Sequence, residues 1–102
     1  MTKVRFSGLA PSEFIERVGA IKLELYCLKY KSLREAQLIL EPGREAELFT
    51  ATIAGSFTSG GEKIVSRSAT NLYLSVILVG EAFESYLENQ FSQPENVYDE
   101  RL

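Results

Sequence analysis

The sequence predicts an α+β domain in which two helices pack on one face of a four-stranded sheet, in the order β-α-β-β-β-α. The chain has 102 residues, of which 45% are hydrophobic and 25% charged, as is usual for one globular domain. Four short segments have the composition and alternation of strands, and two longer segments repeat apolar residues at helical spacing. We expect a single domain over residues 1–91 and a polar, flexible tail over residues 92–102.

The four strands are expected at residues 2–8, 34–43, 46–57 and 62–68. Pro42-Gly43 closes the second strand, and the glycines at 60 and 61 form the turn of an antiparallel hairpin between the last two. Alternation places apolar residues on one sheet face, among them Val4, Phe6, Ala36, Leu38, Leu40, Phe49, Ala51 and Ile53. The other face should carry Lys3, Arg5, Thr50, Thr52, Lys63 or Val65, and Arg67.

The first helix is expected to begin near Pro11 or Ser12 and to end between Tyr30 and Leu33. Glu13 and Glu16 in its first turn suit the positive end of the helix dipole. Its core-facing side is predicted from apolar residues spaced four and three apart, namely Phe14, Val18, Ile21, Leu25 and Leu28. Further apolar residues widen that side, namely Leu23, Tyr26, Cys27 and Tyr30.

The stretch ATNLYLSVILVGEAF, residues 69–83, has two interpretations. Its β-branched and aromatic residues suit a buried strand, which would end at Gly80 and leave a short separate helix. One helix over residues 71–91 requires fewer assumptions, because residues 69–71 supply candidate N-caps and helical spacing continues past Gly80. The spacing is carried by Leu72, Val76, Val79, Phe83 and Leu87. We therefore predict a helix.

Catalytic chemistry has no support in the sequence. Without histidine, the usual general base and the Ser-His and Cys-His pairs are absent, and a single cysteine leaves no common zinc site. We expect no enzyme activity, no metal and no cofactor. Cys27 is expected in the core, and its being the only cysteine fits a reducing compartment. With no signal peptide or long apolar span, we expect a cytoplasmic protein with neither a membrane nor a DNA partner.

Charge is divided unevenly along the chain. Residues 1–34 hold seven bases and three acids, a net +4, whereas residues 35–102 hold four bases and eleven acids, a net −7. The basic part could face an anionic partner, although uneven scatter is common in a short chain. The second helix carries Glu81, Glu84 and Glu88 and has no Lys or Arg between residues 71 and 91.

The element order and the stretch GEKIVSRSATNLYLSVILVGEAFESYLENQF resemble the ribosome hibernation-promoting factors, also called the σ54-modulation or ribosome-associated inhibitor family. The strand VRFSG and the strand AQLIL add to a resemblance that covers residues 2–91. It implies the family's fold, and a stress-response role in translation in which the protein occupies the decoding channel of the small ribosomal subunit. It also implies binding of ribosomal RNA through lysine and arginine.

Two surfaces are therefore candidates for function. The bases expected to contact RNA phosphates are Arg17, Lys22, Lys29, Lys31 and Arg34, supported by Arg5 and Arg67. The rival hypothesis is a protein-interaction module that assembles, as a homodimer, through the excess apolar surface of the second helix. Its contact residues would be Tyr73, Leu74, Ile77 and Leu78.

Overall fold

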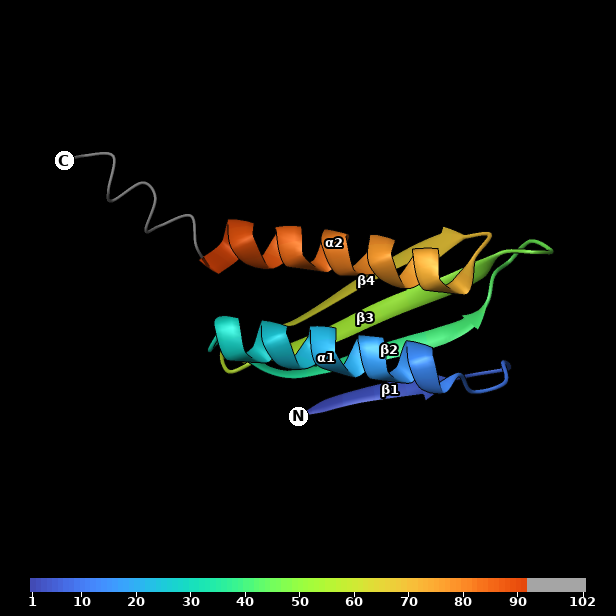
Figure 1. Cartoon of the computed structure of the whole chain (residues 1–102). Coiled ribbons are helices and arrows are strands. Elements are labelled where there is room, and N and C mark those ends of the chain that lie inside the picture. Colours follow the sequence, from blue (N-terminus) through green and yellow to red (C-terminus); the bar gives the residue numbers. More distant parts are fainter. Residues whose placement is uncertain (92–102) are drawn as a thin grey trace.

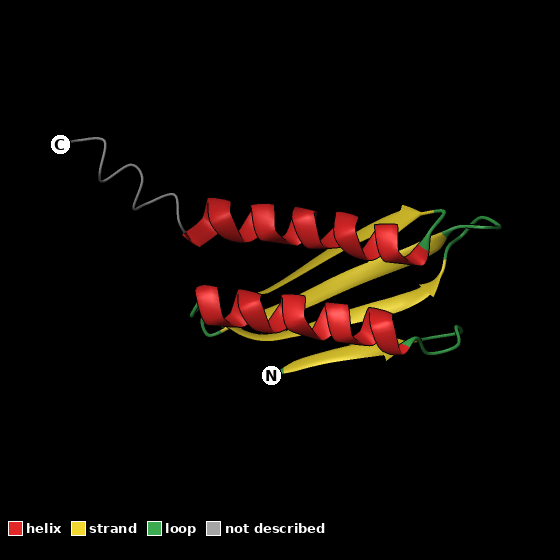
Figure 2. Cartoon of the chain, in the orientation of Figure 1, coloured by secondary structure: helices red, strands yellow, loops and turns green. Residues whose placement is uncertain are grey.

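Two helices lie side by side on one face of a four-stranded sheet in the computed structural model, which describes residues 1–91 (Figure 1, Figure 2). The elements are β1 (Thr2–Phe6), α1 (Glu13–Lys29), β2 (Leu33–Pro42), β3 (Phe49–Phe57), β4 (Glu62–Ala69) and α2 (Leu72–Phe91). The predicted fold class and element order are confirmed. The predicted flexible tail, residues 92–102, lies outside the described residues.

The sheet has the order β1-β2-β3-β4. β1 is parallel to β2, and α1 crosses over between them, whereas β2–β3 and β3–β4 are antiparallel pairs. The β3–β4 hairpin is therefore confirmed. Both helices run in the same direction across the sheet, so their amino ends lie together and their carboxyl ends lie together (Figure 1).

The strand register corrects one sequence-based expectation about the open sheet face. Lys3, Arg5, Thr50 and Thr52 lie on that face as predicted, and the hydroxyl groups of Thr50 and Ser68 are 2.8 Å apart there. The register shows that three other residues point to the helix side, because directly paired residues share a face. Lys63, Val65 and Arg67 pair with Gly55, Ile53 and Ala51, all buried beneath the helices.

Helix α1 begins where predicted, and Leu23, Tyr26 and Tyr30 are buried as expected, but most of the apolar row predicted to face the core is exposed. Ser12 caps it by accepting a hydrogen bond from the Ile15 backbone N–H (3.3 Å), and Tyr30 is its C-cap. The side packed on the sheet consists of Ile15, Gly19, Leu23 and Tyr26. The predicted core-facing row is wrong: Phe14, Ile21, Leu25 and Leu28 are exposed, and Val18 is half-buried.

Close packing at Gly19 explains this orientation. A Cβ atom at Gly19 would lie 2.6 Å from Leu38 of β2 and 3.3 Å from Val4 of β1. Because no side chain intervenes, the helix backbone can approach these strands closely there. The row that contains Phe14 and Leu25 has no such small residue, so turning it inward would hold the helix farther from the sheet.

Of the two interpretations of residues 69–83, the helix is correct, because the stretch is helical from Leu72 onward. Asn71 caps the helix, and its side-chain oxygen accepts a hydrogen bond from the Leu74 N–H at 3.0 Å. The predicted core positions are correct: Val76, Val79, Phe83 and Leu87 are almost fully buried, and Leu72 is half-buried. Phe83 occupies space that Gly55 of β3 leaves free, since a Cβ at Gly55 would lie 2.7 Å from the Phe83 ring.

We predict that Gly55→Ala destabilises the fold, because the new methyl group would overlap Phe83 and Leu33 in the core. Overpacking of this kind costs about 1–3 kcal/mol of unfolding free energy. Gly61→Ala is the matched control, since no atom lies within 4 Å of its Cβ position, and it should change stability by less than about 0.5 kcal/mol. Urea unfolding measures both, and equal stability of the two variants would contradict the described packing of Phe83.

Candidate functional site

The bases predicted to contact RNA fall into separate groups. Arg17, Lys22 and Lys29 lie on α1, and Lys31 and Arg34 follow in the turn after it and at the start of β2. All of them are exposed except Lys22, which is half-buried. The fold therefore brings five of the seven predicted residues to α1 and its carboxyl end.

Arg5 and Arg67 lie apart from this group. Arg5 is exposed on the open face of β1, the side away from the helices. Arg67 is exposed on β4, at the opposite edge of the sheet, and its guanidinium donates to the Ser66 carbonyl at 2.7 Å. One flat partner surface cannot contact both of these residues and α1 at once.

Three bases gather where α1 ends, and we call Lys29, Lys31 and Arg34 the cationic end. The Lys29 ammonium lies 4.0 Å from a carboxylate oxygen of Glu88, but the two side chains are 58% and 54% exposed. A solvated pair of this kind contributes about 0–1 kcal/mol. Lys29 can therefore exchange Glu88 for another anion at little cost.

The side of α2 next to this group is acidic. Glu81 and Glu88 are exposed, Glu84 is half-buried, and the helix carries no Lys or Arg. Burial, together with the charges of Glu84 and Glu81, raises the pKa of Tyr26 on α1 to about 12. The charges of these carboxylates are therefore felt between the two helices, where they would repel a phosphate group.

One buried hydrogen bond joins the helices. The Tyr26 hydroxyl donates to the backbone carbonyl of Gly80 at 3.1 Å. A Cβ atom at position 80 would itself lie 3.1 Å from that hydroxyl oxygen, so the absence of a side chain permits the contact. This bond helps fix how α1 and α2 lie beside each other.

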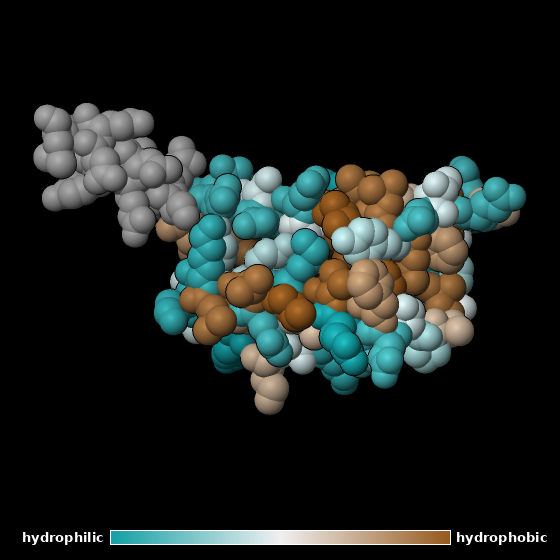
Figure 3. All heavy atoms as spheres, in the orientation of Figure 1, coloured by the Kyte–Doolittle hydropathy of each residue, from teal (hydrophilic) through white to brown (hydrophobic). Residues whose placement is uncertain are grey.

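Apolar side chains cover much of the outer side of the helix layer, which we call the apolar helix face. Six of them are exposed to between 42% and 66%: Phe14, Ile21, Leu25 and Leu28 on α1, and Tyr73 and Leu74 on α2. The rings of Phe14 and Tyr73 lie 5.7 Å apart and connect the two helices at their amino ends. Figure 3 shows the hydrophobic side chains of this face over both helices.

This face shares two residues with the interface predicted on α2 and extends onto α1. Tyr73 and Leu74 are exposed as that hypothesis requires, whereas Ile77 and Leu78 are half-buried. Sequence reasoning missed the four exposed residues of α1, because it assigned them to the core. The signal that could have identified them is the second apolar row of α1, since a helix on one sheet buries only one side.

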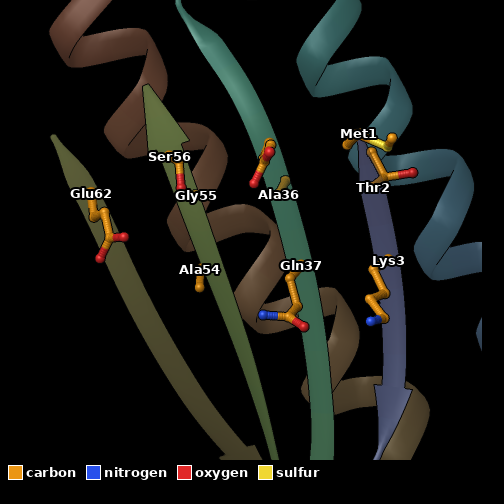
Figure 4. Close-up of a pocket in the computed structure, with 10 residues that line it drawn as sticks. Met1, Thr2, Lys3, Ala36, Gln37, Ala54, Gly55, Ser56 and Glu62 are labelled. Atoms are coloured by element: carbon orange, nitrogen blue, oxygen red, sulfur yellow. The ribbon is translucent and has the colours of Figure 1, made fainter. Parts of the chain in front are cut away.

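Two shallow hollows accompany these surfaces. The first, of about 490 Å³, lies between the helices and is lined by Lys22, Leu25, Tyr26, Leu28, Lys29 and Glu84. The second, of about 420 Å³, crosses the open sheet face, where Lys3, Gln37 and Ala54 form a row over three neighbouring strands (Figure 4). Neither hollow holds a paired nucleophile and base among its lining residues.

The part of the chain that the structure describes offers no metal site, since no three His, Cys, Asp or Glu side chains converge within residues 1–91. Cys27 is half-buried against the core, and burial raises the pKa of its thiol, which disfavours the reactive thiolate. Over the same residues, neither helix has the length and hydrophobicity needed to cross a membrane.

Comparison with solved structures identifies the fold. The N-terminal domain of Thermus thermophilus Protein Y matches with a TM-score of 0.70 and 18% identity, over 85% of this chain and 93% of that one. A ribosomal subunit interface protein from Coxiella burnetii matches with a TM-score of 0.76 and 13% identity, over 90% of this chain and 99% of that one. The structural resemblance expected from the sequence is thus confirmed at the level of the fold. No protein-family model and no curated protein matches the chain.

We predict that Tyr26→Phe lowers the unfolding free energy by about 1 kcal/mol at neutral pH, because the variant cannot make the buried hydrogen bond to Gly80. In the wild type, the raised pKa means that stability from Tyr26 is complete below pH 10 and declines as pH rises towards 12. The variant should lack that part of the alkaline decline. Urea unfolding at several pH values measures both effects.

Tyr30→Phe is the matched control for this prediction. The Tyr30 hydroxyl is buried and has no hydrogen-bond partner among residues 1–91, so its removal should leave stability unchanged or raise it. If Tyr26→Phe were as stable as Tyr30→Phe at every pH, the hydrogen bond between the helices would contribute nothing to the unfolding free energy.

Proposed function

We propose that this chain binds the ribosome at its small subunit and acts by occluding the decoding channel, without catalysing a reaction. The observation that carries the proposal is the fold shared, over 90% of the chain, with a protein named as a ribosomal subunit interface protein. The fold shared with the Protein Y domain over 85% of the chain adds support. A ribosomal partner would also place the chain in the cytoplasm.

The cationic end is the part of the surface best suited to ribosomal RNA. Lys29, Lys31 and Arg34 are exposed, and ammonium and guanidinium groups bind phosphate oxygens regardless of base sequence. Lys22 and Arg17 extend the basic surface along α1. Each phosphate that these groups neutralise releases counterions, which favours binding at low salt.

Acidic α2 limits how the chain can approach RNA. Glu81, Glu84 and Glu88 lie beside the bases of α1, so a phosphate backbone laid across both helices would meet like charge. Contact through the cationic end avoids this repulsion. We therefore infer that the domain meets RNA with the carboxyl end of α1, while Arg5 and Arg67 contribute little.

We predict that replacing Lys29, Lys31 and Arg34 by glutamine weakens ribosome binding by roughly tenfold or more at moderate salt. The slope of log affinity against log salt should also fall by about three, because three phosphates would no longer be neutralised. Co-sedimentation with purified ribosomes at stepped salt concentrations measures both quantities. Lys3→Gln, Arg5→Gln and Arg67→Gln combined form the control, with the same change of charge on other surfaces.

Two results would contradict this assignment. Equal weakening in the control would mean that net charge, rather than the cationic end, determines binding. Failure of the wild-type chain to sediment with ribosomes even at low salt would remove the ribosome as partner altogether.

A second candidate function, protein association, is favoured by the apolar helix face. Large exposed apolar side chains on two adjacent helices are a feature of protein-binding surfaces rather than of RNA-binding ones. Homodimerisation through α2, as expected from the sequence, belongs to this candidate.

A further inference from the structure

The apolar helix face is large for an isolated chain. A fully accessible aromatic side chain presents roughly 150–250 Å² and an aliphatic one somewhat less, so six side chains at about half exposure leave on the order of 600 Å² of apolar surface at most. The largest apolar patch on a typical monomer covers about 300–600 Å², and each partner in a standard interface buries roughly 800 Å². The patch is therefore at the upper end of the range for a monomer, and it supplies most, but not all, of one side of a standard interface.

We propose that this face binds a second copy of the chain, with α1 of one copy lying over α2 of the other. The reason is the distribution of charge within the face. Lys22 and Lys29 edge the hollow on the α1 side, and Glu84 edges it on the α2 side, with Glu81 and Glu88 on the same helix. Each chain thus carries bases on α1 and acids on α2, side by side, and these two groups have complementary charge.

A two-fold axis parallel to the helices brings these two groups together. Such an axis places α1 over the partner's α2 and repeats the same contact a second time, as a symmetric interface requires. The bases of each α1 then meet the acids of the facing α2 at both sides of the interface. Within residues 1–91 of the single chain, only Lys29 and Glu88 come within 4.0 Å, so Lys22 and the half-buried Glu84 along the hollow have no ion-pair partner there.

The direction of the helices supports this axis over one that crosses them. Both helices run the same way (Figure 1). Phe14 lies beside Tyr73 at one end, and Lys29 lies beside Glu88 at the other. An axis along the helices therefore packs apolar ends on apolar ends and charged ends on charged ends. An axis across them would lay Glu88 on the Tyr73 end of the partner and bury carboxylates against apolar groups, which is costly.

The dimer and the ribosome-bound chain would exclude each other, because both use Lys29. The dimer would therefore be a form in which Lys29, one of the three bases of the cationic end, is covered. Self-association is nevertheless measured without ribosomes, so its failure is distinguishable from failure of the proposed ribosome binding.

The experiment is sedimentation velocity over a range of protein concentrations, with two charge-reversal variants. Variant A carries Lys22→Glu and Lys29→Glu, and variant B carries Glu84→Lys and Glu88→Lys. We expect the wild type to dimerise, and each variant alone to dimerise at least about tenfold more weakly because like charges then face each other. An equimolar mixture of A and B should recover the dimer, since every α1 again meets an α2 of opposite charge.

The control variant carries Lys3→Glu and Arg5→Glu on the open sheet face, and it should dimerise like the wild type. Leu25→Glu with Leu28→Glu should abolish the dimer, with circular dichroism verifying that the exposed substitutions leave the fold intact. A monomeric wild type at all concentrations would overturn the proposal. A dimer that A and B each retain, or that their mixture fails to restore, would overturn the pairing of α1 with α2.

Discussion

At Gly19 the backbone of α1 comes so close to β1 and β2 that a Cβ atom would lie 2.6 Å from Leu38. This approach determines which side of the helix is buried. It turns Leu23 and Tyr26 toward the sheet, and Tyr26 then reaches the Gly80 carbonyl of α2. The same rotation leaves Leu25 and its neighbours in the apolar row in water. The surface available for function is therefore a consequence of how one glycine packs.

Two surfaces of different chemistry result from this arrangement. The cationic end can bind phosphate groups, and the apolar helix face can bind another protein surface. The carboxylates of α2 would repel RNA from most of the helix layer. The fold is shared with a ribosomal subunit interface protein, so the ribosome is the partner proposed first. A dimer that covers Lys29 would connect the two surfaces, because protein concentration would then control access of Lys29 to RNA.

Much of the fold could be predicted from the sequence, because alternation and helical spacing are local signals. The helix over residues 72–91 follows from Asn71 and from core spacing that continues beyond Gly80. The orientation of α1 could not be predicted in the same way. It carries two apolar rows, and the choice between them depends on contacts of Gly19 with residues distant in sequence. For the same reason, the sequence showed which residues are basic but not how far apart the fold places them. Arg67 lies on β4, away from α1.

Methyl NMR with a soluble paramagnetic probe would test, in one measurement, the orientation of α1 and self-association through the apolar helix face. At low protein concentration the Leu25 and Leu28 methyl groups should relax strongly, while those of Leu23 remain protected. As concentration rises, Leu25 and Leu28 should become protected as a second copy covers them. Accessible Leu23 methyl groups would contradict the packing at Gly19, and Leu25 and Leu28 methyl groups that stay accessible at every concentration would contradict self-association through this face.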